Sequence, residues 1–301
     1  MILALLGANG QLGSDLVRAV GAVEGVEILG LTRHDLDVTD LPGISAALAA
    51  SKFDVLVNCT GYHKTEEVEG RASEAFRINA HAVLAMAKAC KRQRARFVHI
   101  STDYVFDGDA RHPYQEDDTA EPLNVYGSSK LLGEKLAMRE YATGTIVARV
   151  ASLFGVAGSS GKGRNFVETI LRKAKEGGEV RVVNDITMCP TSTADAAKTI
   201  LALLRKEAPP GVYHVVNSGS GTWFDFAQEA VQAAGMGTKV IPTTSDEYPT
   251  AAARPRYSVL DNQKSSSIAG EIPHWKDALR RYLSEKGHIA SDQARVAVAS
   301  S

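Results

Sequence analysis

Three glycines near the start of the chain restrict what it can fold into. Gly7, Gly10 and Gly13 follow the short apolar run 2–6 and open the amphipathic stretch 11–20. Glycine is needed where a backbone turns tightly or approaches a phosphate, and a helix N-terminus offers that phosphate free N–H groups and a positive dipole end. Glycine triplets also make plain turns, but a position between strand and helix is typical of dinucleotide-binding loops. The loop predicts a Rossmann-type unit that binds NADPH or NADH.

Short apolar runs alternate with helical patterns along the chain, which is typical of a parallel sheet with crossover helices. The expected strands are 2–6, 26–32, 55–59, 97–101, 145–150, 180–183 and 212–216. The expected helices are 11–20, 73–92, 125–141, 164–175, 193–205, 223–234 and 275–283. The predicted fold class is α/β: a Rossmann-type doubly wound parallel sheet with a smaller C-terminal α/β substrate-binding region.

The same pattern suggests how the chain is divided. We assign 1–150 to the cofactor-binding core and expect the strands near 180–183 and 212–216 to join it. Residues 151–286 should mainly bind substrate, with long loops at 155–164 and 241–262. The end, 287–301, is small and polar without an apolar stripe, so we predict a flexible tail.

Composition and charge argue against several classes of protein. The formal net charge of the 301 residues is −1, which provides no electrostatic case for nucleic acid or an anionic membrane. The three cysteines form no CxxC and no disulfide framework, and the apolar start is too short for a signal peptide or a membrane span. The eight histidines show no zinc-ligand spacing. The expected location is the cytoplasm.

Tyr126 and Lys130 form a YxxxK pattern on the predicted helix 125–141. Side chains at i and i+4 share a helix face, so we expect the ammonium beside the phenol, where a cation lowers the tyrosine pKa. The phenol could then protonate a carbonyl as nicotinamide delivers hydride, while Lys130 holds the nicotinamide ribose. Thr102 ends the strand 97–101, where its hydroxyl could polarise that carbonyl. YxxxK alone is common, but this order of motifs indicates a reductase.

The end of the second predicted strand bears on the choice of dinucleotide. It reads Leu31-Thr32-Arg33 and carries no carboxylate. An acidic residue there would accept the 2′-hydroxyl of NAD, whereas an arginine accommodates the 2′-phosphate of NADP. Arg33 therefore favours NADPH, with a solvated loop arginine as the alternative. Asp37 and Val38 should border the adenine.

Taken together, these motifs resemble the dTDP-4-dehydrorhamnose reductase family, a branch of the extended short-chain dehydrogenase/reductases. The resemblance covers nearly the whole chain except the tail. The matching segments include GANGQLG (7–13), STDYVFDG (101–108), YGSSK (126–130) and RPRYSVLD (254–261). The specific ones are GxxGQLG, TDYVFDG and RPxxSxLD in this order. It implies a Rossmann fold with a small C-terminal substrate domain, and reduction of the 4-keto group of dTDP-4-dehydro-L-rhamnose.

The resemblance also implies residue roles. Tyr126 is the implied proton donor, Lys130 its partner and ribose anchor, and Thr102 the carbonyl ligand. Cofactor contacts are implied for Gly10, Gln11, Leu12, Asp37, Val38, Gly61, Tyr62 and His63, although His63 could be simply a polar loop residue. Substrate contacts are implied for Asp103, Asn165 and Arg254. Arg254 suits a diphosphate because its fork matches phosphate oxygens, with a surface arginine as the alternative.

Some family members have Mg²⁺ at a homodimer contact. A homodimer therefore agrees with the resemblance, but we predict no metal site in this chain. Asp15 and Asp195 lie on predicted helices, and we interpret them as exposed, solvated carboxylates.

Departures from the family pattern fall on the substrate side and leave the identity of the sugar open. Ser152 replaces a usual tryptophan, and the segments 61–66 and 185–189 also differ. Two alternatives to a reductase remain. One is a nucleotide-sugar epimerase of the same superfamily; the other is a non-catalytic regulatory subunit resembling the methionine adenosyltransferase beta subunit. Tyr104 after Asp103, in place of a second carboxylate, argues against a dehydratase.

Overall fold

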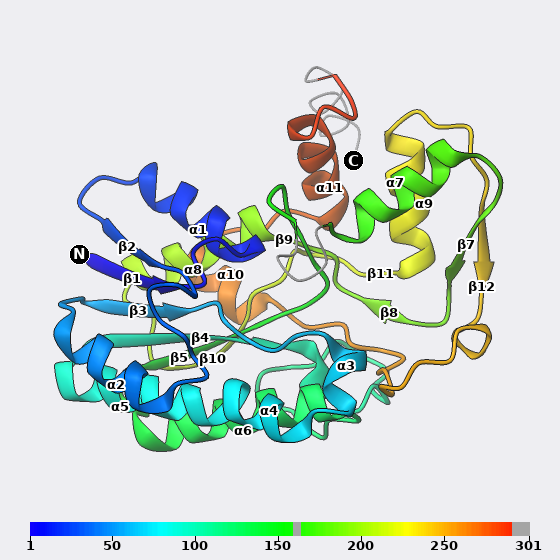
Figure 1. The fold of residues 1–301 in the computed structure, drawn as a ribbon. Helices are drawn as coiled ribbons and strands as arrows, with labels where there is room; N and C mark the ends of the chain where they lie inside the picture. Colours follow the sequence, from blue (N-terminus) through cyan, green and yellow to red (C-terminus); the bar gives the residue numbers. More distant parts are fainter. Residues whose placement is uncertain (159–163, 291–301) are drawn as a thin grey trace.

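The computed structural model describes residues 1–158 and 164–290. Its centre is a six-stranded sheet in which every neighbouring pair of strands is parallel (Figure 1). The strands lie in the order β10 (Gly211–His214), β5 (Thr145–Val150), β4 (Arg96–Thr102), β3 (Val55–Asn58), β1 (Ile2–Leu6) and β2 (Glu27–Leu31). The predicted α/β class and the Rossmann-type parallel sheet are confirmed.

Helices cover both faces of this sheet (Figure 1). One layer contains α1 (Gln11–Gly21), α8 (Thr193–Arg205) and α10 (Gln263–Ala269), and the other contains α2 (Leu41–Ala50), α5 (Ala82–Gln93) and α6 (Val125–Glu140). Two layers form because successive strand side chains point to opposite faces. Leu5 of β1 lies in one buried cluster with Leu16 of α1, whereas Leu6 lies in the other with Ile44 of α2.

The order of the strands decides where a ligand can bind. The chain leaves β1 toward β2 on one side and returns to β3 on the other. Open α/β sheets bind ligands at such a reversal, outside the carboxyl ends of the strands. The glycine loop after β1, the segment after β3 and the Thr102–Asp103 pair at the end of β4 all lie at this edge.

Several helical regions, α10 among them, differ from the sequence expectation. The predicted helix 73–92 consists of α4 (Ala72–Phe76), a π-helical turn (Arg77–His81) and α5. Helix α2 was not expected, because its apolar residues are not confined to one face. It forms nevertheless, since Asp40 caps its first turn by accepting a hydrogen bond from the Gly43 N–H at 3.1 Å. A short helix, α3 (Thr65–Glu69), follows β3.

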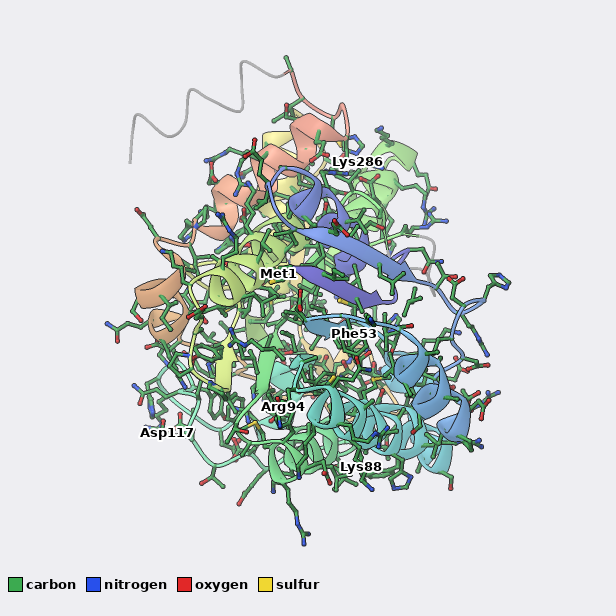
Figure 2. The ribbon with its side chains drawn as sticks, turned by 90° about the vertical axis from the view of Figure 1, so that its left-hand side faces the viewer. Met1, Phe53, Lys88, Arg94, Asp117 and Lys286 are labelled. Carbon is green, nitrogen blue, oxygen red and sulfur yellow. The ribbon has the colours of Figure 1, made fainter. Side chains whose placement is uncertain are left out.

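The remaining strands form three two-stranded sheets. β7 (Val180–Val183) pairs with β12 (Val240–Thr243), β8 (Thr187–Met188) with β11 (Gly221–Thr222), and β6 (Leu153–Phe154) with β9 (Thr191–Ser192). Helices α7 (Phe166–Glu176), α9 (Trp223–Ala233) and α11 (Trp275–Glu285) accompany them. Figure 2 shows the molecule from the side, with Lys286 beyond α11 at one end and Lys88 of α5 at the other.

The predicted place of the strand 180–183 is wrong. It forms, but it pairs with β12 rather than with the central sheet, and β12 falls in the segment 241–262 that we expected to be a loop. Val180 and Val182 are buried against α7 and α9, whereas Arg181 between them is exposed. This alternation suits a two-stranded sheet covered on one face. The strand expected at 212–216 does join the central sheet, as β10 beside β5.

The start of the predicted flexible tail is packed. His288 Nε2 lies 3.0 Å from Glu168 Oε1, and Ile289 packs against a buried aromatic cluster. Residues 291–301, and residues 159–163 of the predicted loop 155–164, lie outside the described residues. Within the described ranges, no helix has the length and apolarity needed to cross a bilayer.

Candidate active site

The glycine loop has the geometry that a phosphate site needs. Gly7 has a φ of +78°, and its N–H donates to the Leu31 carbonyl at 2.9 Å, which ties the loop to the end of β2. A Cβ on Gly13 would lie 2.1 Å from the Gly7 oxygen, so only glycine allows this approach. Helix α1 starts at Gly10 without a side-chain cap. Its first N–H groups are therefore suited to a pyrophosphate.

Gln11 and Leu12, which follow Gly10, have different roles in the loop. Leu12 is buried in the core beneath the sheet, so only its backbone can face a ligand. The Gln11 side chain donates to the Leu153 carbonyl at 3.2 Å, which links the loop to the segment after β5.

The residues expected near the adenine ribose lie beyond β2. The Arg33 side chain is 83% exposed, with Nη2 3.7 Å from Asp37 Oδ2. Asp37 Oδ1 accepts bonds from the backbone and hydroxyl of Thr39, both at 2.9 Å, and these bonds lower the pKa of its carboxyl. Val38 packs against the sheet. Arg33 is held only weakly, so its guanidinium can turn toward a phosphate.

The segment after β3 lies beside the predicted catalytic lysine. A Cβ on Gly61 would lie 3.9 Å from Lys130 Nζ. The Tyr62 N–H donates to Asn79 Oδ1 at 2.8 Å, and its phenol donates to Glu67 at 2.7 Å, so the Tyr62 ring is held by α3. His63 Nδ1 lies 3.3 Å from the Gly61 oxygen.

Asn79, on the π-helical turn, is a residue that the sequence analysis missed. Its amide also donates to Ser129 Oγ of α6 at 3.0 Å, so it connects the segment after β3 with the helix that carries Tyr126. A π-helical turn is frequent at functional sites, but it has no sequence signature that would have revealed this one.

Thr102, Asp103 and Tyr126 are brought together, as predicted. The Thr102 hydroxyl donates to Asp103 Oδ1 at 3.0 Å, and it lies beside the Tyr126 phenol, whose pKa it lowers. The Tyr104 ring meets the Tyr126 ring edge-on, with centroids 5.9 Å apart. Burial raises the pKa of Asp103 to about 6. Burial also raises the pKa of Tyr126, and Thr102 offsets this rise only in part.

The expected effect of Lys130 on Tyr126 is wrong. Lys130 Nζ donates to the Ile100 carbonyl at 2.5 Å and lies 3.3 Å from His99 Nε2, so β4 holds the end of the side chain. The pKa of Tyr126 rises, and Lys130 is not among the groups that shift it. Lys130 itself is only 4% exposed, and burial lowers its pKa to about 8.

The side chain of Arg254 contacts helix α3, although the two are far apart in the sequence. Its Nη2 donates to Glu66 Oε1 at 2.7 Å, while Glu66 Oε2 accepts from the Ala252 N–H at 3.1 Å. Its Nε is buried without a hydrogen-bond partner among the described residues. Burial raises the pKa of Tyr104, whose ring contacts Tyr126, to about 12, and the nearby charge of Arg254 opposes this rise. Arg254 thus lies near the predicted catalytic residues; Glu66 was not predicted.

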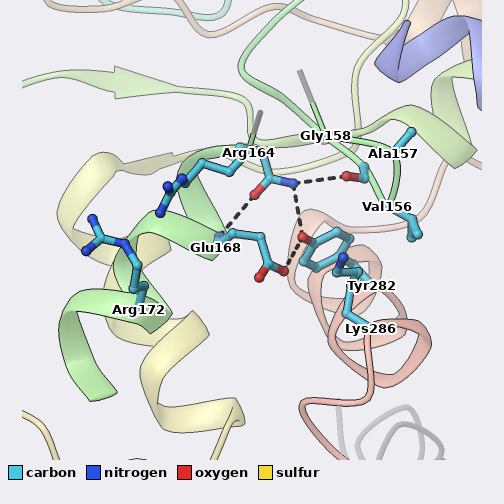
Figure 3. Close-up of a pocket in the computed structure, with 10 residues that line it drawn as sticks. Val156, Ala157, Gly158, Arg164, Glu168, Arg172, Tyr282 and Lys286 are labelled. Atoms are coloured by element: carbon cyan, nitrogen blue, oxygen red, sulfur yellow. Dashed lines mark hydrogen bonds between the residues drawn. The ribbon is translucent and has the colours of Figure 1, made fainter. Parts of the chain in front are cut away.

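Asn165 lies in a different place. Its Oδ1 caps α7 by accepting from the Glu168 N–H at 3.1 Å, and its Nδ2 donates to the Gly155 carbonyl and to the Tyr282 hydroxyl, each at 3.0 Å (Figure 3). It lines a cavity of about 390 Å³ with Arg164, Arg172 and Lys286 among its neighbours. The structure therefore brings Asn165 together with Tyr282, not with Thr102 and Tyr126.

The interpretation of Asp15 and Asp195 as solvated is wrong, since they are only 4% and 3% exposed. Asp15 accepts from Thr193 Oγ1 at 2.5 Å, and Asp195 accepts two bonds from Arg281 at 3.0 and 2.7 Å. Both carboxylates already have protein partners, so this pair does not fit Mg²⁺. The described residues contain no group of three or more metal-ligating side chains.

Comparisons with known proteins identify the family of this chain. The family model described as the RmlD substrate binding domain matches residues 1–287. The spore coat polysaccharide biosynthesis protein SpsK of Bacillus subtilis is 36% identical over 93% of this chain and 96% of its own length. The dTDP-4-dehydrorhamnose reductase of Escherichia coli is 35% identical over 95% and 98%.

A solved structure shows the same fold. The dTDP-4-dehydrorhamnose reductase of Bacillus anthracis, in complex with NADP, superposes with a TM-score of 0.87 at 33% identity, covering 94% of this chain and 99% of the other. The chain therefore belongs to the dTDP-4-dehydrorhamnose reductase family.

Proposed function

We propose that this chain reduces the 4-keto group of a 6-deoxy sugar linked to a nucleoside diphosphate, with dTDP-4-dehydro-L-rhamnose as the expected substrate. The family consists of oxidoreductases, and the relative of known structure holds NADP, which supports NADPH as the reductant. The observation that carries the proposal is the meeting of Thr102 and Asp103, both buried at the carboxyl end of β4, with the half-buried Tyr126 of α6, on the same sheet edge as the glycine loop.

Bound NADPH would supply the hydride that reduces the sugar carbonyl carbon. The chain's own part is to orient the carbonyl oxygen and to give it a proton. Tyr126 is the proton donor: its phenolic O–H bond breaks as the new alcohol O–H bond forms. Because burial raises its pKa, the Tyr126 phenol is protonated at neutral pH, so a proton is available for the more basic alkoxide as it develops. Thr102, which lies beside the phenol, would help to place it against the carbonyl oxygen.

The dinucleotide would be held at three places. The first turn of α1 and the glycine loop suit the pyrophosphate, because their N–H groups lack side-chain caps. Lys130 would hold the nicotinamide ribose, since its Nζ lies beside the segment after β3. Arg33 would reach the 2′-phosphate, which the exposed position of its side chain allows.

The substrate side rests on Arg254. A guanidinium binds a diphosphate through paired N–H groups, and the Nε of Arg254 is buried without a described partner. Glu66 holds the same guanidinium at 2.7 Å, so the two residues together would position the nucleotide end of the substrate. Asp103, whose carboxylate lies next to Thr102, would contact the sugar.

The test is a set of keto sugar nucleotides offered to the full chain with NADPH, followed by absorbance and by product analysis. We expect stoichiometric NADPH oxidation with dTDP-4-dehydro-L-rhamnose. Tyr126→Phe should lower kcat by about 10²-fold or more while leaving NADPH affinity nearly unchanged. Tyr104→Phe, which keeps the neighbouring ring, is the matched control. Substantial turnover of Tyr126→Phe would refute the proton donor, and sugar conversion without NADPH consumption would identify an epimerase.

A further inference from the structure

A line of buried polar side chains lies behind Tyr126 and Lys130, and the mechanism above does not use it. Asn58 of β3 and His99 of β4 are partners in the parallel sheet, and they are 1% and 0% exposed. Asn58 Nδ2 lies 3.3 Å from His99 Nδ1, and Lys130 Nζ lies 3.3 Å from His99 Nε2. Since buried polar groups need matched partners, the direction of each bond has consequences for its neighbour.

The direction of the first bond is determined by Thr60. The backbone N–H and the hydroxyl of Thr60 both donate to Asn58 Oδ1, at 3.0 and 2.6 Å. A backbone N–H can only donate, so the amide oxygen of Asn58 must lie on this side. Its Nδ2 group then faces His99 and can only donate to Nδ1. The hydrogen of a neutral His99 ring therefore sits on Nε2.

Burial of the His99 side chain favours the neutral form of its ring. Burial and the nearby charge of Lys130 lower the pKa of His99 well below its ordinary value. The Nε2–H of His99 consequently points at Lys130 Nζ. An ammonium has three donors and no acceptor, so it would meet this N–H donor to donor. A neutral amine accepts from Nε2–H with its lone pair and still donates to the Ile100 carbonyl at 2.5 Å.

The surroundings of Lys130 include features that lower its pKa and features that raise it. Burial lowers its pKa to about 8, whereas Glu134 of α6 and Cys59 after β3 raise it. Glu134 is itself engaged by Arg149, with Oε2 2.8 Å from Nη2. His99 of β4 is the remaining titratable neighbour in direct contact with Nζ.

We propose that His99 is a positioning residue: held as an Nε2–H donor by Asn58, it disfavours the ammonium form of Lys130 and so lowers the pH at which Nζ loses its proton in the protein without dinucleotide. A ribose hydroxyl can accept a hydrogen bond from the Lys130 ammonium, whereas the Nε2–H group of His99 cannot. Dinucleotide binding should therefore be coupled to the uptake of a proton at Lys130 Nζ. This coupling rests on the proposed function, in which Lys130 holds the ribose. The protonation states inferred for His99 and Lys130 in the free protein do not depend on that function.

The protonation states can be measured on the unmodified full-length chain. Long-range ¹H–¹⁵N spectra of ¹⁵N-histidine-labelled protein should show His99 as the Nε2–H tautomer at neutral pH. Spectra of ¹³C-lysine-labelled protein should show one Cε signal that titrates near 8, whereas exposed lysines titrate near ~10.4. An Nδ1–H tautomer or a charged ring for His99, or the absence of a lysine that titrates early, would overturn the inference.

Two variants test the link between the residues. Asn58→Asp keeps the shape and the bonds from Thr60, but it turns the donor facing His99 into an acceptor, so the midpoint of Lys130 should rise by about one pH unit or more. His99→Phe removes the donor without adding charge and should raise the midpoint as well. His214→Phe, which replaces an equally buried histidine of β10, is the matched control and should leave it unchanged. An unchanged midpoint in both test variants contradicts the inference; if neither variant folds, the tautomer in the unmodified chain decides.

Calorimetry of NADPH binding separates this inference from the proposed function. Titrations near pH 8.5 in buffers of different ionisation enthalpy should show uptake of up to one proton, which disappears as the pH falls below 7. If the tautomer and the midpoint are as expected but no proton is taken up, the role of Lys130 as ribose anchor is wrong and the inference about His99 stands.

Discussion

Asp103→Asn should make the protein more stable at neutral pH. Asp103 is 3% exposed, and burial raises the pKa of its carboxyl from 3.8 to about 6. Each pH unit of such a difference corresponds to ~1.36 kcal/mol, so keeping this carboxylate charged in the folded protein costs up to about 3 kcal/mol. Asparagine has the same shape, can still accept the bond from Thr102, and carries no charge.

The pH dependence has a definite sign. Because the folded-state pKa lies above the unfolded one, the contribution of Asp103 to stability is fully present below pH 3.8 and is lost as the pH rises through about 6. The advantage of Asp103→Asn over the unmodified chain should therefore be largest above pH 7 and should shrink as the pH falls from 6 toward 4.

The assay is denaturant unfolding of both chains between pH 4 and pH 8. Asp107→Asn is the matched control, because hydrogen bonds from Tyr114 and from the backbone lower the pKa of Asp107. That variant should be less stable than the unmodified chain at pH 8. The reasoning about Asp103 fails if Asp103→Asn is destabilised at pH 8, or if its advantage does not change with pH.

Three further predictions concern the cofactor loop, the core and the substrate side. Gly13→Ala should abolish NADPH binding, measured by fluorescence titration, because its Cβ would lie 2.1 Å from a backbone oxygen; retained affinity would contradict the loop geometry. Arg149→Met should lower the free energy of unfolding in urea by about 3–5 kcal/mol, because it leaves the Glu134 carboxylate charged and buried without its partner. A loss below ~1 kcal/mol would show that Glu134 does not depend on Arg149 for compensation of its charge. Arg254→Lys should raise KM for the sugar nucleotide about tenfold with little change in kcat, because a lysine cannot form the paired contact; Glu66→Gln should raise it less, and an unchanged KM in Arg254→Lys would remove Arg254 from the site.

Local patterns in the chain were enough to predict its framework. The glycines at 7, 10 and 13 restrict the backbone by their lack of a side chain, and this steric property acts wherever the loop lies. The alternation of strand and helix patterns similarly determines the parallel sheet, because strand side chains face two sides and both need cover. Thr102 and Tyr126 were predicted to meet because the end of β4 and the start of α6 lie at one sheet edge.

Other features depend on contacts between distant segments. The direction of the Lys130 side chain is decided by the Ile100 carbonyl and His99, which no spacing rule includes. The strand 180–183 joins β12, because the apolar side chains of α7 and α9 cover one of its faces. Asp15 and Asp195 appear to be surface carboxylates in the sequence, yet Thr193 and Arg281 hold them in buried positions. Sequence periodicity identifies which residues are apolar; only the tertiary structure decides which buried polar groups become partners, because their bonds join residues far apart in the chain.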